Sequence, residues 1–245
     1  MILGVDVSTA TIGVCLLEDN NTDKGKIIEL THISPKVSTK IDPVEQLFLK
    51  KKLFEEFIQK YSQYPIEEVI IEEPLMRSNN VNTVSVLLRF NGMISDCVYN
   101  VLGIVPKYIS SYDARKYAFP ELVAVRKYSK ENELYEPKRI IKEIEKNKFV
   151  LFGSYPWTVD KKTVLQEKVA ELFPEIPWLY DKKGELKKQN FDSCDAYVAC
   201  LGWLKKQKNG EPVFKATDVE IHDDEVNYNV SYWNKVEPRT TYLNR

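Results

Sequence analysis

The 245-residue sequence predicts an α/β fold built around a mixed β-sheet. Strand-like segments follow one another closely at the start of the chain, which is the pattern of an antiparallel meander. Later strand-like segments are separated by long amphipathic helices, as parallel strands require. One of these later segments is short and continuously apolar, which is typical of an inner strand buried on both faces. We therefore expect a mixed sheet flanked by helices.

The predicted strands of the meander cover residues 2–5, 11–17 and 26–33. The first of these strands ends on a single carboxylate, Asp6. A lone acid at the tip of a core strand is costly to bury unless a charged group lies beside it. We expect that group to be a divalent metal ion, held together with carboxylates from later in the chain.

A helix is predicted over residues 43–61, because Asp42 and Glu45 have the spacing of a capping box around Pro43. The next strand is the apolar run 69–71, which also ends in acid. Because helical periodicity continues as far as a glycine, a long helix follows over residues 82–102.

Residues 104–110 form the predicted fifth strand. Asp160 caps a further helix that ends at Pro174, and a loop-rich stretch extends to Gln189. The last predicted helix covers residues 191–206, with lysines at its C-terminal end, where the helix dipole favours them.

Composition predicts a folded intracellular protein. The 43% hydrophobic content suffices for a substantial core, and 35 basic residues nearly cancel 36 acidic ones, so a nucleic-acid surface must be local.

The four cysteines lack the spacing of a disulfide scaffold or a zinc site and are expected to be buried thiols. No leader and no apolar run of about 18 residues is found, which predicts a cytoplasmic protein without a membrane span. With two histidines, the chain is poorly supplied for Ser-His or Cys-His catalysis, and carboxylates are the expected catalytic groups.

The most basic section of the chain lies between residues 115 and 168, where 13 Lys or Arg stand against 8 Asp or Glu, a net of +5, with aromatic residues between them. The alternative is a solvated surface without a ligand. Residues 210–245 hold 7 acids and 4 bases and are expected to form a tail that packs in part on the body. The predicted organisation is one domain over residues 1–209, with an insertion at about 120–157, and a C-terminal extension over residues 210–245.

Four carboxylates recur at strand ends and at a helix start. Asp192 and Asp195 stand at positions i and i+3, so they project from one face of the last predicted helix. That pair alone is weak evidence, because helix N-termini favour acids. Together with Asp6 and an acid at the end of the strand 69–71, the pair forms a set of hard oxygen ligands of the kind that Mg²⁺ prefers.

Three segments resemble a known family. Leu-Gly-Val-Asp-x-Ser-Thr from residue 3, Ile-Ile-Glu-Glu-Pro from residue 70 and Phe-Asp-Ser-Cys-Asp-Ala-Tyr-Val-Ala from residue 191 occur in the order found in the RuvC-type Holliday-junction resolvases of the RNase H-like superfamily. The resemblance covers most of residues 1–206. It implies an RNase H-like fold, with a five-stranded mixed sheet of strand order 3-2-1-4-5. Strand one would then lie beside strand four, with Asp6 next to Glu72, whereas Glu73 would point to the opposite face.

The resemblance also implies the activity, that of a crossover-junction endodeoxyribonuclease which hydrolyses phosphodiester bonds in four-way or otherwise branched DNA. Two Mg²⁺ ions, for which Mn²⁺ can substitute, would be held in each active site, with Asp6 as the bridging ligand. The implied catalytic and metal-binding residues are Asp6, Glu72, Asp192 and Asp195. The implied DNA-binding residues are Arg77, Arg115, Lys116, Lys161 and Lys162.

A homodimer is expected as well, because a four-way junction has two-fold symmetry and the helix after Glu72 resembles the family's dimer-forming helix. The chain departs from the family in three places: Leu75 stands where an aromatic wedge is often found, residues 121–157 are longer than the family's connection, and residues after Gly210 have no counterpart.

Three alternatives remain open from sequence. The first is another RNase H-like nuclease, acting on RNA–DNA hybrid or flap DNA. The second is an actin-like or sugar-kinase ATPase, although such a fold needs further glycine-rich phosphate loops and the chain has 9 glycines without such clusters. The third is a DNA-binding protein that keeps the fold without catalysis.

Overall fold

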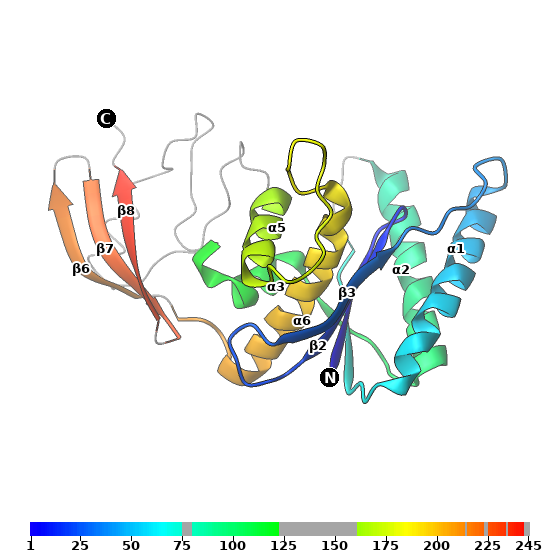
Figure 1. Cartoon of the computed structure of the whole chain (residues 1–245), viewed down its shortest axis with the longest axis horizontal. Coiled ribbons are helices and arrows are strands. Elements are labelled where there is room, and N and C mark those ends of the chain that lie inside the picture. The colour runs from blue at the N-terminus through cyan, green and yellow to red at the C-terminus, as the bar shows by residue number, and fades with distance from the viewer. Residues whose placement is uncertain (75–79, 123–160, 214, 223–224, 234, 243–245) are drawn as a thin grey trace. The chain divides into compact units, whose positions relative to one another are not determined.

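The computed structural model describes residues 1–74, 80–122, 161–213, 215–222, 225–233 and 235–242 (Figure 1). The chain divides into two compact units, the first formed by Met1–Ala114 with Leu165–Leu204 and the second by Arg115–Val164 with Lys205–Arg245. Leu75, Arg77 and nearly all of the predicted insertion lie outside the described residues.

A five-stranded sheet organises the first unit (Figure 1). Its strand order is β3-β2-β1-β4-β5. The pairs β1–β2 and β2–β3 are antiparallel, whereas β1–β4 and β4–β5 are parallel. The strands are β1 (Ile2–Val7), β2 (Ile12–Glu18), β3 (Lys26–Ile33), β4 (Glu68–Glu72) and β5 (Lys107–Ile109). The predicted RNase H-like sheet order is thereby confirmed.

Two helices, α1 (Pro43–Ile58) and α2 (Val81–Leu102), cover one face of the sheet. Alternate residues of β1, namely Leu3, Val5 and Val7, share a buried core with Phe54 of α1 and Ile94 of α2. The local signals operate as predicted. The carboxylate of Asp42 accepts hydrogen bonds from the first backbone amides of α1, and Gly103 ends α2 with a left-handed φ of 70°.

The opposite face of the sheet is covered by α6 (Phe191–Asn209). Gly4 on β1 lies directly beneath this helix, because a Cβ built there would stand 2.2 Å from the carbonyl oxygen of Ala196. Gly13 on β2 lies beneath the helix start, where a Cβ would stand 2.0 Å from the carbonyl oxygen of Asp192. The backbone of α6 therefore approaches the sheet closely, at positions that only glycine can occupy.

Several boundaries differ from the sequence prediction. The helix that follows Asp42 becomes a 3₁₀ turn at Gln59–Gln63, and β5 is shorter than residues 104–110. Helix α5 spans Lys161–Leu172, and a short helix not predicted from sequence, α3 (Ser111–Ala118), follows β5.

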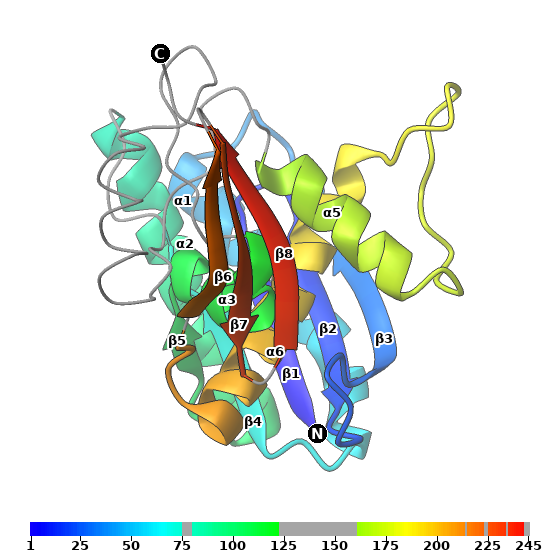
Figure 2. The same ribbon diagram turned by 90° about the vertical axis from the view of Figure 1, so that its left-hand side faces the viewer.

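Residues 210–245, expected to form a C-terminal extension, contain strands that were not predicted from sequence. A three-stranded antiparallel sheet occupies this part of the second unit (Figures 1 and 2). Its strands, which run side by side in the order β6-β7-β8, are β6 (Lys215–His222), β7 (Glu225–Tyr232) and β8 (Lys235–Tyr242).

The four cysteines are free and buried, as predicted. Burial raises the pKa of Cys97 to about 11 and holds the pKa of Cys15 and Cys194 above the usual thiol range. Since these groups stay protonated at neutral pH, they are packing residues rather than nucleophiles.

Candidate functional site

Asp6 belongs to the face of β1 that α6 covers. Its neighbours Val5 and Val7 point into the core beneath α1 and α2, and Gly4, two residues earlier, lies under α6. Because side chains alternate along a strand, Asp6 shares the face of Gly4. The side chain is 9% exposed. The polar end of β1 is therefore enclosed near the start of α6.

Glu72 lies level with Asp6 on the neighbouring strand. The parallel register pairs Val5 with Ile71, so one step further along both strands brings Asp6 beside Glu72. Ile71 points into the core beneath α1 and α2, whereas Glu68, at the start of β4, accepts a hydrogen bond of 2.7 Å from Trp203 of α6. Glu72 is four residues after Glu68 and thus shares the α6 face.

The direction of α6 brings its N-terminus to the same edge. Trp203 contacts the beginning of β4, and eight residues earlier Asp195 lies about 12 Å back along the helix axis. Glu68 and Glu72 are separated by about 13 Å along β4. Asp195 is therefore level with the end of β4. Asp192 lies above Gly13, which is the strand partner of Asp6.

These four side chains, Asp6, Glu72, Asp192 and Asp195, form what we call the carboxylate edge. The first two come from adjacent parallel strands, and the last two come from the first turns of the covering helix. Asp195 is 2% exposed, while Glu72 and Asp192 are half-buried. The start of α6 is anchored by Ser193, whose hydroxyl donates to the carbonyl oxygen of Thr31 on β3 at 2.9 Å.

The donor set of the carboxylate edge fits Mg²⁺ in type, since all four groups offer hard oxygens. In the part of the chain that the structure describes, however, no group of three or more His, Cys, Asp or Glu side chains is gathered closely enough to hold a metal ion. The four side chains therefore fit Mg²⁺ in the kind of ligand that they offer and in lying along one edge of the sheet. Closed coordination would require the carboxylates to draw together.

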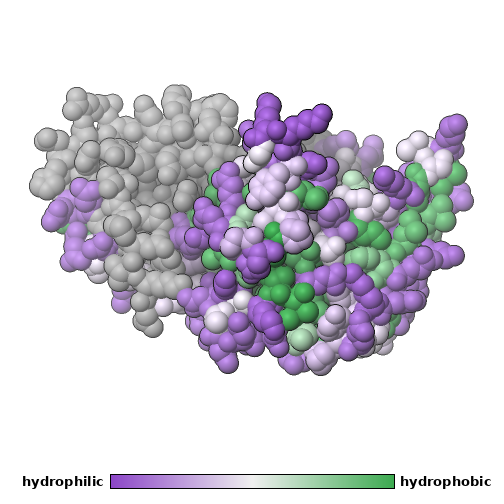
Figure 3. All heavy atoms as spheres, in the orientation of Figure 1, coloured by the Kyte–Doolittle hydropathy of each residue, from purple (hydrophilic) through white to green (hydrophobic). Residues whose placement is uncertain are grey.

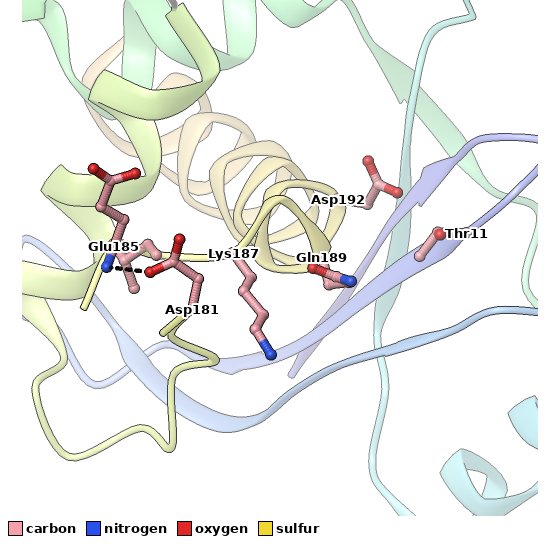
Figure 4. Close-up of a pocket in the computed structure, with 7 residues that line it drawn as sticks. Thr11, Asp181, Glu185, Lys187, Gln189 and Asp192 are labelled. Atoms are coloured by element: carbon pink, nitrogen blue, oxygen red, sulfur yellow. Dashed lines mark hydrogen bonds between the residues drawn. The ribbon is translucent and has the colours of Figure 1, made fainter. Parts of the chain in front are cut away.

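A pocket of about 560 Å³ opens beside Asp192 of the carboxylate edge (Figure 4). Asp192 lines one side of it together with Thr11, which ends the turn after β1. That turn is fixed by Lys50 of α1, whose ammonium donates to the carbonyl oxygen of Thr9 at 2.5 Å. The rest of the lining comes from the loop before α6: Asp181, Glu185, Leu186, Lys187 and Gln189. Sequence reasoning missed these loop residues because the stretch has no helical or strand periodicity.

Four of the five basic residues assigned to DNA binding are described, and they belong to the second unit. Lys161 and Lys162 are exposed at the start of α5, and Arg115 is half-buried on α3. Lys116 is 9% exposed and forms an ion pair with Glu211, which holds the pKa of that carboxyl below its usual range. Lys116 is therefore already engaged within its own unit.

No protein-family model and no curated protein sequence matches the chain. Similar solved structures include RuvC of Thermus thermophilus in complex with a Holliday junction substrate, with 10% identity, a TM-score of 0.48, and coverage of 86% of this chain and 96% of that one. Another is the yeast mitochondrial Holliday junction resolvase Ydc2, with 12% identity, a TM-score of 0.43, and coverage of 84% of this chain and 80% of that one. The strand order β3-β2-β1-β4-β5 is the one expected from the sequence.

A more distant similarity is to a MamK variant bound to AMPPNP, with 12% identity, a TM-score of 0.26, and coverage of 97% of this chain and 71% of that one. With TM-scores below 0.5, these similarities leave the function to be inferred from the carboxylate edge. No helix within the described ranges is long and apolar enough to cross a membrane.

Proposed function

We propose that this chain is a divalent-metal-dependent endonuclease that cleaves branched DNA, with the four-way junction as its main substrate. The observation that carries the proposal is the carboxylate edge. Asp6 and Glu72 lie level on adjacent parallel strands, and the start of α6 brings Asp192 and Asp195 to the same face. Four acids from three separate segments lie along one edge of the sheet.

Each acid has a distinct role in this proposal. Asp6 is on β1, which lies between β2 and β4 in the sheet. From this central strand it would contribute to both metal sites. Glu72 and Asp195 complete the ligand set, and Asp192 faces the pocket. Mg²⁺ ions, when bound, would supply a polarised water and neutralise charge on the scissile phosphate. The enclosed positions of Asp6 and Asp195 keep bulk water away from that chemistry.

The substrate assignment rests on local basic residues. Arg115, Lys161 and Lys162 are proposed to hold phosphates of the junction arms without reading bases. Arg77 is assigned the same role from sequence. Lys116 is the least suited of the five, because Glu211 already neutralises its charge.

A homodimer is proposed from the exposed apolar side chains of α1 and α2, two helices that pack on each other. Val44, Phe48 and Leu49 on α1, and Val81 and Leu88 on α2, are between 38% and 76% exposed. Figure 3 shows hydrophobic residues on the surface where α1 lies in Figure 1. Such a surface is expected to be covered by a partner, and a second copy matches the symmetry of a junction.

The experiment that tests this function compares substrates. The chain is incubated with Mg²⁺ and a synthetic four-way junction, a linear duplex made from the same arm sequences, a flap duplex and an RNA–DNA hybrid. We expect the junction to be cut much faster than the duplex, by paired nicks. Equal rates on junction and duplex would favour a general nuclease, and preferential cutting of the hybrid or the flap would favour another RNase H-like activity.

A DNA-binding protein without catalysis is the second candidate. It is favoured by one observation, namely that no three metal-binding side chains are gathered within the described residues. Calorimetric titration with Mn²⁺ separates the two candidates. The nuclease binds the ion in the absence of DNA, and replacement of Asp6 by Asn weakens that binding; the non-catalytic protein shows no binding to lose.

A further inference from the structure

The loop between α5 and α6 has no role in the proposed nuclease chemistry, although it lies beside one of the four acids. We define the 179–190 loop as the residues from Leu179 to Asn190. It contains four lysines and two acids, a net charge of +2. It supplies five of the seven residues that line the pocket beside Asp192 (Figure 4). This loop therefore faces the same pocket as Asp192, one member of the carboxylate edge.

The loop is a built structure rather than a loose connection. Its two arms pair as a small hairpin, in which the amide of Lys187 donates to the carbonyl oxygen of Leu179 and the amide of Asp181 donates to that of Glu185, both at 2.8 Å. The carboxylate of Asp181 accepts the amide hydrogens of Lys183 and Glu185 at 2.7 and 2.9 Å. One of the two acids is thus occupied in shaping the turn.

Two buried amide side chains hold the hairpin in place: Asn190 closes its two ends, and Gln166 joins it to α5. Asn190, 5% exposed, donates to the carbonyl oxygen of Leu179 at 3.0 Å and accepts from its amide at 3.3 Å. Gln166 of α5, 1% exposed, donates to the carbonyl oxygen of Lys187 at 2.8 Å. Burying a polar side chain is costly unless it is hydrogen-bonded, so these anchors specify one position for the loop.

A lysine therefore lies across the pocket from a carboxylate. Lys187 is exposed and lines the pocket that Asp192 lines on the other side (Figure 4). Lys182 and Lys183 are exposed on the turn of the same hairpin. An anion that approaches the carboxylate edge is repelled by the acids, so a positive charge nearby lowers the barrier to its approach.

We propose that the 179–190 loop is a phosphate clamp, in which Lys187 binds a backbone phosphodiester of the nucleic-acid strand that enters the carboxylate edge. The inference rests on the proposed function and deepens it, since it names a contact to the substrate. The loop is already ordered by its anchors, so binding fixes one lysine side chain rather than a whole segment. Lys182 and Lys183 extend the positive surface along the strand.

The test measures binding without cleavage. A fluorescein-labelled four-way junction is titrated with the full chain in EDTA, at several KCl concentrations between 50 and 200 mM, and anisotropy is recorded. We expect Lys187→Ala to weaken binding about fivefold at the lowest salt and to reduce the slope of log affinity against log salt by about 1. Lys187→Arg should restore the slope because it keeps the charge.

The matched control is Lys26→Ala, which removes an exposed lysine from the start of β3, at the opposite end of the sheet from Asp6. Binding and salt slope should stay at the wild-type values. A Lys187→Ala variant that behaves like Lys26→Ala, or a wild-type chain that does not bind the junction, would overturn the clamp. If Lys187→Ala lowers binding while no substrate is cut in Mg²⁺, the clamp stands and the nuclease proposal fails. If the junction is cut and Lys187→Ala leaves binding unchanged, the nuclease proposal stands and the clamp fails.

Discussion

Glu72 and Glu73 are adjacent acids that differ in the face of β4 to which they belong. Glu72 shares the α6 face with Glu68, which contacts Trp203, whereas Glu73 follows the strand and belongs to the other side. The amide of Glu73 continues the pairing by donating to the carbonyl oxygen of Ile109 at 2.9 Å. The two adjacent residues therefore differ in their proposed roles: Glu72 is a ligand, whereas Glu73 is not.

The two acids can be distinguished by paired substitutions. Glu72→Gln should reduce the single-turnover rate of junction cleavage by at least about 100-fold, because even groups that only orient a metal ligand are worth 10- to 100-fold. Glu73→Gln should stay within about threefold of the wild-type rate, because the lost charge faces away from the site. A larger loss for Glu73→Gln than for Glu72→Gln would show that the ligand has been assigned to the wrong face.

At the scale of elements, the seating of α6 on two glycines positions the carboxylate edge. A side chain at Gly13 would collide with the backbone of Asp192, which cannot move aside as a flexible side chain can. The close approach sets how far Asp192 lies from Asp6, the strand partner of Gly13. The glycine is thus a requirement of the site although it carries no chemistry.

Gly13→Ala should destabilise the chain by about 2 kcal/mol, the usual order for overpacking a fitted contact. This corresponds to a fall of roughly 4–8 °C in the unfolding temperature for a chain of this size. Gly92→Ala is the control, because a Cβ at Gly92 meets nothing within 4 Å and alanine favours the helix interior. Thermal unfolding monitored by circular dichroism measures both. Equal unfolding temperatures for the two variants would contradict the close seating of α6.

Sequence patterns were sufficient for the elements whose signals are local. The cap at Asp42, the stop at Gly103 and the meander over residues 2–33 were all predicted within a few residues. The order of the strands was different in kind. It depends on contacts between distant segments and entered only through the resemblance of three short motifs.

The second sheet was missed although its pattern is clear. In β7, Val226, Tyr228, Val230 and Tyr232 alternate with polar residues, which is a strand signal. The excess of acids in residues 210–245 outweighed that signal in the prediction. The composition of a segment indicates how well it is solvated, whereas the spacing of its apolar residues indicates which face is buried. The spacing is therefore the better predictor of a strand.

For the candidate site, the four acids could be selected from sequence because each follows a recognisable apolar run or stands in the first turns of a predicted helix. The 179–190 loop could not, because its position depends on Gln166 and Asn190, whose hydrogen bonds to the loop backbone leave no periodic trace. Lys116 was likewise assigned to DNA binding without knowledge of its partner. Its motif fits a phosphate contact, but the ion pair with Glu211 is visible only in three dimensions.

At the scale of the whole molecule, the proposed dimer depends on the apolar surface of α1 and α2. Leu88→Glu places a charge among exposed apolar side chains of these helices and should convert a dimer into a monomer in sedimentation velocity at micromolar concentration. Val105→Glu is the control. Val105 is 71% exposed, but it is in the loop that connects α2 to β5 and is not one of the helix residues of the proposed interface. A wild-type chain that sediments as a monomer at tens of micromolar would argue against this interface.

The central claim is that the carboxylate edge is the catalytic centre of a nuclease. Its most direct test is the single-turnover cleavage of a synthetic four-way junction in Mg²⁺ by the wild-type chain and by Asp6→Asn, which keeps the shape of the side chain and removes its charge. We predict cleavage by the wild-type chain, its loss in EDTA, and a fall of at least about 1,000-fold for Asp6→Asn, since the variant removes the charge of the metal ligand proposed on the central strand. Cleavage that persists in the Asp6→Asn variant at a comparable rate would contradict the claim.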